Sequence, residues 1–222
     1  MPSWSAGSDA TLLVRAGPEP CVAVLGTFSE EARSRLVALS HHLEHGTPRL
    51  VDYRDAERDC DRLAAKLLDT FGSDSLHRFG FTALPRGGFI VLGMLSYVAG
   101  LSRSQLTAPA ALDRPLVVVD DIALTGHRFG EFLARAPQPE IVFATLYSPP
   151  PLRRAIEEKE SRVLACVSAH DLPDLAPAML GAECEAWRAR MLDRLPPPRY
   201  WVGQPEVVSF AWSEPEWGFW NT

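Results

Sequence analysis

The sequence has few cysteines, no long apolar run and no excess of positive charge. Its four cysteines are far apart and form no CxxC or Cys/His spacing, which is typical of buried or free thiols in a reducing compartment. The longest apolar stretch, Phe89–Val98, is far too short to cross a membrane. A formal net charge of −6 argues against a nucleic-acid surface, which needs clustered Lys and Arg.

The first residues, Met1–Ala10, are polar and lack the charged start and apolar run of a signal peptide. We therefore expect a protein of the cytoplasm with neither a nucleic-acid nor a membrane partner. A dinucleotide-binding enzyme of the Rossmann type is disfavoured as well, because no GxGxxG follows any predicted strand. A small anionic ligand stays possible, since a few local N–H groups and one Arg can hold it whatever the overall charge.

The chain does have enough apolar sequence for a large core: 46% of its 222 residues are hydrophobic. Apolar segments alternate between strand-like and helix-like patterns. Strands are predicted at Val22–Leu25, Phe79–Leu84, Leu116–Val119, Ile141–Leu146 and Arg162–Ser168, and helices at 30–47, Ala56–Phe71, Phe89–Val98, Gly126–Ala136, Pro151–Lys159 and Ala182–Leu195. This alternation predicts an α/β fold with a doubly wound, mostly parallel sheet.

We divide the chain into an N-terminal strand and helix extension (1–50), a core (51–180) and a C-terminal helix with an aromatic tail (181–222). Within the core, Phe89–Val98 is apolar nearly all round. Such a pattern predicts a helix buried on every side, between the sheet and a partner subunit. We expect a homodimer.

Two adjacent carboxylates, Asp120 and Asp121, directly follow the predicted strand Leu116–Val119. They repel each other at the edge of a low-dielectric core, so the pair is unfavourable unless something binds it. Ribose hydroxyls and a hydrated Mg²⁺ are natural partners, since Mg²⁺ prefers one or two carboxylates with retained waters. The alternative is that one carboxylate caps the next helix, but a cap leaves the other unexplained.

The turn that follows leads into a predicted helix N-terminus, where unpaired N–H groups suit a phosphate. Thr125 adds a hydroxyl donor, and Gly126 lets the backbone approach a ligand closely. The residues expected to bind the phosphate are Ala123, Leu124, Thr125, Gly126, His127 and Arg128.

A second loop, Leu84–Gly88, places Gly87 and Gly88 beside Arg86 at a strand-to-helix turn. This pattern indicates an anion nest with Arg86 as the forked counter-charge. Many strand-to-helix turns contain two glycines, so the order along the chain matters more. The loop lies one strand-helix unit before the Asp pair, which predicts two anion sites on the same edge of the sheet.

Together these segments resemble the type I phosphoribosyltransferase family. Val117–Gly126 is similar to its signature: a hydrophobic strand, two acidic residues, three variable positions and Thr-Gly. Leu84–Gly88 is similar to its pyrophosphate loop, and the helix before a strand and PRGG resembles bacterial and archaeal 6-oxopurine members. The resemblance covers about Asp52 to Ser148.

The resemblance implies that phosphoribose is transferred from phosphoribosyl pyrophosphate to a nucleobase-like acceptor, with Mg²⁺. Asp120 and Asp121 would bind the ribose 2′- and 3′-hydroxyls and the Mg²⁺ shell, and 123–128 the 5′-phosphate. Pyrophosphate would lie on the second loop, held by Pro85, Arg86, Gly87 and Gly88. Asp120, Asp121 and Arg86 are then the expected catalytic residues.

Two departures from the family pattern keep an alternative open. Arg128 stands where the family usually has a small hydroxyl residue, and Gly100–Pro115 is short for the family's mobile catalytic loop. The alternative is a regulatory protein of the same fold that binds a phosphoribosyl ligand or nucleotide without turnover.

Aromatic residues crowd the C-terminus, and Phe210 and Trp212 are predicted to stack on the acceptor base. The alternative is that these rings attach the tail to the core or form a dimer contact. Asp171 follows the predicted strand Arg162–Ser168 and is also expected at the ligand edge, as a base contact or a loop cap.

Overall fold

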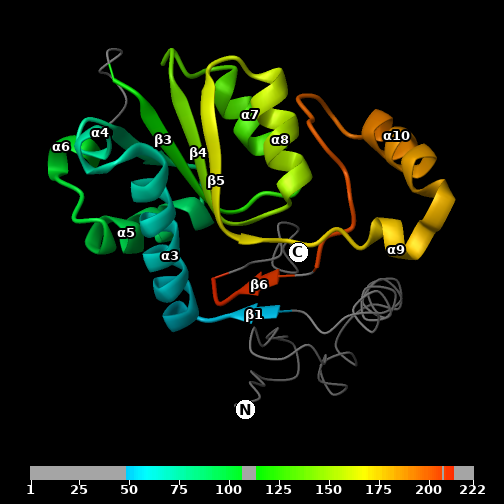
Figure 1. Cartoon of the computed structure of the whole chain (residues 1–222), viewed down its shortest axis with the longest axis horizontal. Helices are drawn as coiled ribbons and strands as arrows, with labels where there is room; N and C mark the ends of the chain where they lie inside the picture. Colours follow the sequence, from blue (N-terminus) through cyan, green and yellow to red (C-terminus); the bar gives the residue numbers. More distant parts are fainter. Residues whose placement is uncertain (1–48, 107–113, 207, 213–222) are drawn as a thin grey trace, which may run out of the picture. The chain divides into compact units, whose positions relative to one another are not determined.

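The computed structural model describes residues 49–106, 114–206 and 208–212 (Figure 1). The N-terminal strand and helix expected within residues 1–48 lie outside this range. The described residues belong to two compact units. One is Arg54–Pro205; the other joins the described residues before Arg54 to those after Pro205. The larger unit therefore runs beyond position 181, where the sequence-based division placed a boundary.

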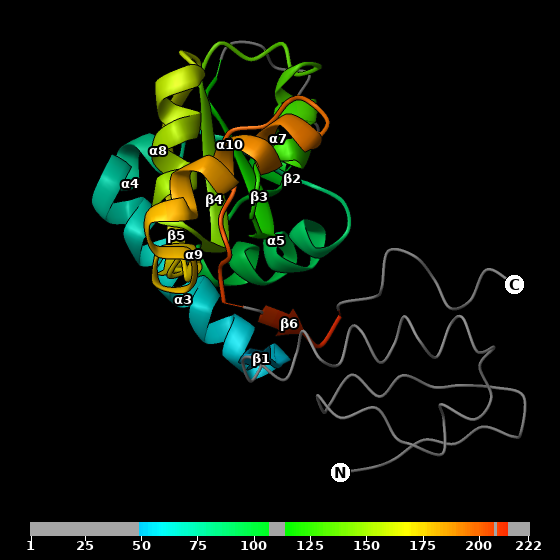
Figure 2. The ribbon, with the colours of Figure 1, turned by 90° about the vertical axis from the view of Figure 1, so that its right-hand side faces the viewer.

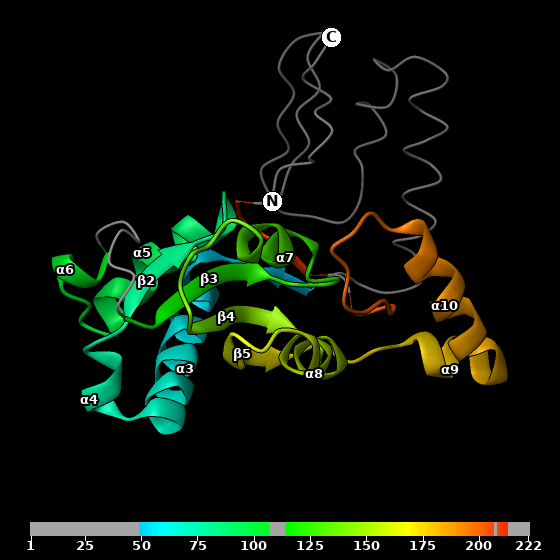
Figure 3. The same cartoon turned by 90° about the horizontal axis from the view of Figure 1, so that it is seen from above.

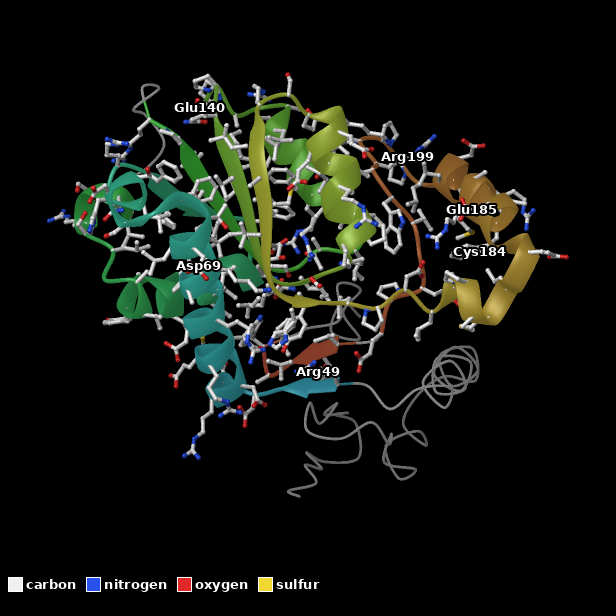
Figure 4. All side chains as sticks on the ribbon, viewed as in Figure 1. Arg49, Asp69, Glu140, Cys184, Glu185 and Arg199 are labelled. Atoms are coloured by element: carbon white, nitrogen blue, oxygen red, sulfur yellow. The ribbon has the colours of Figure 1, made fainter. Side chains whose placement is uncertain are left out.

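The larger unit contains a four-stranded parallel sheet in the order β2-β3-β4-β5, which confirms the predicted fold class. Its strands are β2 (Gly80–Ala83), β3 (Leu116–Ile122), β4 (Ile141–Ser148) and β5 (Val163–Asp171). β4 is buried along its whole length. Because the strands are parallel, all their carboxyl ends lie at one edge. Glu140, directly before β4, marks the opposite edge in Figure 4.

Helices cover both faces of the sheet, as a doubly wound fold requires. They are α3 (Tyr53–Phe71), α5 (Gly87–Val98), α7 (His127–Leu133) and α8 (Pro150–Lys159). Figure 3 shows α3 on one side of the strands and α7 and α8 on the other. α5 lies beside α3, since the Cys60 thiol donates to the Val91 carbonyl at 3.8 Å.

The α7–α8 face forms a continuous apolar core. Phe129 of α7 stacks on Phe143 of β4, with ring centroids 3.9 Å apart and an interplanar angle of 11°. Leu152 and Ile156 of α8 are fully buried in the same cluster. On the other face, the helical stripe that predicted α3 is buried: Ala56, Cys60, Leu63, Ala64 and Leu67. These two apolar layers hold the carboxyl edge of the sheet in place.

Within the single chain, Phe89–Val98 is buried on one side only, and burial of its other side by a partner subunit stays a prediction. Val91 and Leu95 are fully buried, but Phe89 is 56% exposed and Tyr97 is 90% exposed. The reason is that α5 packs against β2, β3 and α3 along one side only.

Short helices complete the larger unit: α4 (Ser73–Leu76), α6 (Arg103–Leu106), α9 (Ala176–Leu180) and the 3₁₀ turn η1 (Gly181–Glu183). The predicted C-terminal helix is present as α10 (Cys184–Arg194). After α10 the chain returns towards α7 and α8 (Figure 2), and Tyr200 donates its hydroxyl to Glu160 at 2.6 Å. This return segment was not predicted.

The smaller unit pairs β1 (Arg49–Val51) with β6 (Val208–Phe210) in parallel. Phe210 is 2% exposed and stacks on Trp212, with ring centroids 4.8 Å apart. Tyr53 lies against the same indole at 5.6 Å. Phe210 and Trp212 therefore pack on each other, and Trp212 packs on Tyr53. Among the helices of the described residues, none combines the length and hydropathy that a membrane span requires.

Candidate active site

Asp120 and Asp121 lie near the carboxyl end of β3, and they are only 2% and 8% exposed. The amide of Asp121 donates to Asp120 Oδ1 at 3.1 Å, and the amide of Ile122 donates to Asp121 Oδ1 at 2.9 Å. Neither carboxylate caps the following helix, because Gly126 is the N-cap of α7. The capping alternative for the acid pair is therefore excluded.

The buried environment of Asp120 disfavours its charged form. Burial raises the pKa of Asp120 to about 8; the Arg128 guanidinium opposes this shift, and the neighbouring Asp121 adds to it. Arg128 is partly exposed and offsets the effect of burial on Asp120 only in part. A bound cation or hydroxyl donors would favour the ionised carboxylate further.

The two predicted loops are in direct contact. The Arg128 guanidinium on α7 donates from Nη2 to the carbonyl of Pro85, and the same nitrogen lies 3.3 Å from Asp120 Oδ1. Arg128 therefore bridges the Asp pair and the PRGG loop. The expectation that the two loops share one edge of the sheet is confirmed.

Gly87 and Gly88 are required by this close approach. A Cβ atom built on Gly87 would lie 1.7 Å from Asp121 Oδ2, and one on Gly88 would lie 2.5 Å from the Val119 carbonyl oxygen. No side chain fits at such distances. The peptide bond between Pro85 and Arg86 is cis, and α5 begins directly afterwards at Gly87. The glycines therefore bring the loop backbone against the acid pair.

Three backbone amides of the turn Ala123–Gly126 have no hydrogen-bond acceptor among the described residues. Among the hydrogen bonds of the described residues, none uses the amides of Leu124, Thr125 or Gly126. Ala123 instead donates to the Tyr147 carbonyl at 3.0 Å, and Gly126 adopts a φ of 77°. A side chain at Gly126 would be strained. Three consecutive amides without a protein acceptor suit an anion.

The return segment after α10 fixes this turn from one side. Tyr200 donates its amide to the Thr125 carbonyl at 3.2 Å, and a Cβ at Gly126 would lie 2.7 Å from the Tyr200 ring. The His127 imidazole lies 3.0 Å from the Pro198 carbonyl, and the Thr125 hydroxyl accepts the His127 amide at 3.4 Å. The His127 side chain is thus engaged by the protein, which sequence reasoning missed because Pro198 and Tyr200 are distant in sequence.

The donor set at the end of β3 fits Mg²⁺ rather than a metal held by protein alone. Among the described residues, no group of three or more His, Cys, Asp or Glu side chains could hold a metal ion. Asp120 and Asp121 supply two adjacent, buried carboxylates. Mg²⁺ is typically bound in this way, through one or two carboxylates, with waters and substrate phosphates completing its shell.

A third group of polar residues at the same edge was not predicted. Asp59 of α3 accepts hydrogen bonds from Tyr147 of β4 and His170 of β5. The local sequence carries no signal for this cluster, because Asp59 lies far along the chain from both partners. Asp171 lies at this edge as expected, as the last residue of β5; it pairs with Arg153 at 2.5 Å and its side chain is largely exposed.

Phe210 and Trp212, the predicted base contacts, belong to the smaller unit. The two rings stack on each other. A contact between either ring and an acceptor base stays a prediction.

No family model and no curated protein matches this chain. Solved structures are similar to it. One is a hypothetical protein from Neisseria gonorrhoeae with bound ppGpp: 16% identity, covering 58% of this chain and 86% of that chain, with a TM-score of 0.42. Another is a hypoxanthine-guanine phosphoribosyltransferase from Bacillus anthracis: 16% identity, 54% and 78% coverage, TM-score 0.36. A third is an orotate phosphoribosyltransferase from Aeropyrum pernix: 20% identity, 48% and 67% coverage, TM-score 0.33.

Proposed function

We propose that this protein is a phosphoribosyltransferase that uses phosphoribosyl pyrophosphate and Mg²⁺ to transfer phosphoribose to a nucleobase-like acceptor. The observation that carries the proposal is the contact between the buried Asp120–Asp121 pair and the Gly87–Gly88 loop. The contact supports the proposal because it would put a sugar hydroxyl site beside an anion loop at the carboxyl edge of a parallel sheet, where α/β proteins bind ligands.

In the proposed complex, Asp120 and Asp121 accept hydrogen bonds from the ribose 2′- and 3′-hydroxyls. The amides of Leu124–Gly126 bind the 5′-phosphate, and the loop Arg86–Gly88 holds the pyrophosphate. Mg²⁺, held by the two carboxylates, would neutralise charge on the pyrophosphate as it leaves. The residues of the chain contribute by fixing the sugar and its leaving group in one orientation.

The reaction needs no covalent intermediate with the protein. A ring nitrogen of the acceptor attacks the ribose C1, and the bond from C1 to the pyrophosphate oxygen breaks with its electron pair leaving on oxygen. In the proposed mechanism, Arg128 has one partner in the ligand-free protein and another in the complex. It lies beside Asp120 in the ligand-free protein, and in the proposed complex it pairs with the 5′-phosphate once the hydroxyls occupy Asp120.

The test is Mg²⁺-dependent release of pyrophosphate with a panel of purine and pyrimidine bases, combined with calorimetry of phosphoribosyl pyrophosphate binding. We expect binding that requires Mg²⁺ and product with at least one base. No heat of binding and no product with any base would refute the proposal. We further propose a homodimer, which analytical ultracentrifugation checks.

A second function is supported by two features of this chain. Arg128 already occupies a position between the two loops, and the connection between α5 and β3 is short. Both features suit a regulatory protein that binds a phosphoribosyl ligand or nucleotide without turnover. Tight binding of phosphoribosyl pyrophosphate without product from any base would favour this function over the transferase.

A further inference from the structure

Asp59, Tyr147 and His170 form a second polar cluster at the carboxyl edge of the sheet. The Tyr147 hydroxyl donates to Asp59 Oδ2 at 2.5 Å, and His170 Nε2 lies 2.5 Å from Asp59 Oδ1. The Tyr147 ring is stacked on the imidazole, with centroids 4.8 Å apart and an interplanar angle of 9°. Asp59 itself is only 6% exposed. The imidazole is thus held in one plane and one orientation.

This arrangement selects one tautomer of His170. An ionised carboxylate only accepts hydrogen bonds, so Nε2 carries the hydrogen that faces Asp59. Nδ1 is then the nitrogen with an available lone pair. A buried carboxylate that orients a histidine in this way is a recurring means of preparing an imidazole to accept a proton.

The cluster lies across the sheet edge from the proposed sugar site. Ile122, directly after Asp121, is aligned with Tyr147, and Tyr147 is aligned with His170 on the next strand. Neighbouring strands are about 4.8 Å apart, so His170 is about 10 Å from the end of β3. A ribose held at the Asp pair has room to carry an acceptor ring towards β5 over this distance.

The proposed transfer leaves a proton to be removed, and the sugar site offers no evident group for it. The turn Ala123–Gly126 carries no titratable side chain. Asp120 and Asp121 are committed to the hydroxyls and the cation. The His127 ring donates from Nδ1 to the Pro198 carbonyl, and its Nε2 lies 3.9 Å from Glu131 Oε2 on the same helix. Of the histidines at this edge in the described part of the chain, His170 is the one with a buried carboxylate behind it.

We propose that His170 is the proton acceptor for the acceptor substrate, an inference that rests on the proposed transferase function. As the ring nitrogen forms its bond to C1, its hydrogen passes to His170 Nδ1, and the pyrophosphate leaves with the electron pair of the broken C–O bond. The imidazolium then returns its proton to water. Asp59 and Tyr147 are positioning residues, since they act through the imidazole.

The charged and titratable groups around the imidazole come from α3, β4, β5 and α8. Arg62 of α3 places Nη1 3.0 Å from His170 Nδ1 and 2.8 Å from Nε2, and its side chain is exposed. Arg62 therefore covers Nδ1 in the ligand-free protein and must swing away when an acceptor binds. Asp59 faces the ring from α3, and Tyr147 from β4. Beyond them lie Lys66, bonded to the carbonyls of Ser168 and Ala169, and the Asp171–Arg153 pair.

The experiment compares the wild-type protein with His170→Gln, and uses His77→Gln as a matched control because His77 is exposed on α4's C-terminal side. Steady-state kcat and acceptor KM are measured from pH 5 to 9 at saturating Mg²⁺ and phosphoribosyl pyrophosphate. We expect His170→Gln to lower kcat about 100-fold and to remove the loss of rate that the wild type shows at acid pH. The Kd of phosphoribosyl pyrophosphate should stay within about twofold of wild type, because the sugar site is untouched.

Acceptors with a more acidic N–H provide the second readout. If His170 accepts the proton, such acceptors should lose less rate in His170→Gln, whereas a purely structural role would slow all acceptors alike. A kcat within about threefold of wild type, or a parallel loss of phosphoribosyl pyrophosphate affinity, would overturn the role of His170. If the wild type forms product in the same assay, only the role of His170 has failed. If neither binding nor product is seen, the transferase proposal itself has failed.

A second measurement, the ¹⁵N spectrum of the His170 imidazole, needs no turnover. The His170 signals are assigned as those missing from the spectrum of His170→Gln or, if that variant does not fold, of His170→Asn. The proposal requires the Nε2–H tautomer in the ligand-free protein. The Nδ1–H tautomer would overturn it, because that nitrogen could not accept a proton.

Discussion

Two buried carboxylate sites lie at the same edge of the sheet, and they differ in what satisfies them. Both oxygens of Asp59 accept hydrogen bonds from protein donors, Tyr147 and His170. Asp120 is bonded to the backbone of its neighbour and to one partly exposed arginine, and burial raises its pKa to about 8. At Asp59, the fold itself supplies hydrogen-bond donors to both carboxylate oxygens. At Asp120, these contacts leave the carboxylate with a raised pKa, and we propose that a bound ligand supplies the further stabilisation.

The largest expected effect is on ligand binding at the Asp120 site. Asp120→Asn with Asp121→Asn should weaken phosphoribosyl pyrophosphate binding at least about 100-fold, because each lost charged hydrogen bond costs about 1.5–3 kcal/mol. Calorimetry with Mg²⁺ measures the change. Asp61→Asn with Asp69→Asn, both exposed on α3, removes the same charge and should bind as wild type does. Unchanged affinity in the Asp120/Asp121 variant, with native circular dichroism, would refute the site.

The Asp59 site should matter for stability. Asp59→Ala leaves the Tyr147 hydroxyl and His170 imidazole without their buried acceptor, so we expect the free energy of unfolding to fall by about 3 kcal/mol. Urea denaturation measures it. Asp171→Ala is the control: its ion pair with Arg153 is mostly exposed on the aspartate side, and its loss should cost at most about 0.5 kcal/mol. If the two substitutions lower the free energy of unfolding equally, the Asp59 site is no more important for stability than the exposed ion pair of Asp171.

The contact between the loops can be broken at Gly87. Gly87→Ala forces a methyl group onto Asp121 Oδ2, so we expect a loss of about 2 kcal/mol in stability, together with weaker ligand binding. Gly93→Ala lies in the same helix with nothing within 4 Å of the added atom, and it should stabilise α5 by up to about 1 kcal/mol. A Gly87→Ala variant as stable as Gly93→Ala would show that the loop is not in close contact with the acid pair.

The remaining prediction is a pH dependence of stability without Mg²⁺ or ligand. Because burial raises the pKa of Asp120 to about 8 from its ordinary 3.8, the folded protein keeps a proton that the unfolded chain has released. This contribution to stability is complete below pH 3.8 and is lost as the pH rises towards 8. Thermal unfolding in the presence of a chelator should therefore show Tm falling over this range more steeply for wild type than for Asp120→Asn. Identical slopes of Tm against pH for the two proteins would contradict this prediction.

Local patterns were sufficient for the main elements of the larger unit. The β-branched run at Val117–Val119 predicted a strand buried on both faces, and helical spacing of apolar residues predicted α3 and α8. Such signals are local, since one strand or helix needs only its own periodicity. The four-residue helices and three-residue strands were missed because they are too short to show a period.

The sequence by itself determined the sheet, and it placed the Asp pair and the PRGG loop at strand ends, because parallel strands fix which ends meet. Tertiary structure alone decided the rest: the bridge from Arg128 to Pro85, the packing of Tyr200 against Gly126, and the union of Asp59 with His170. Each joins residues that are 43 to 111 positions apart in the sequence. Such contacts follow from how the layers pack, which no local spacing of residues specifies.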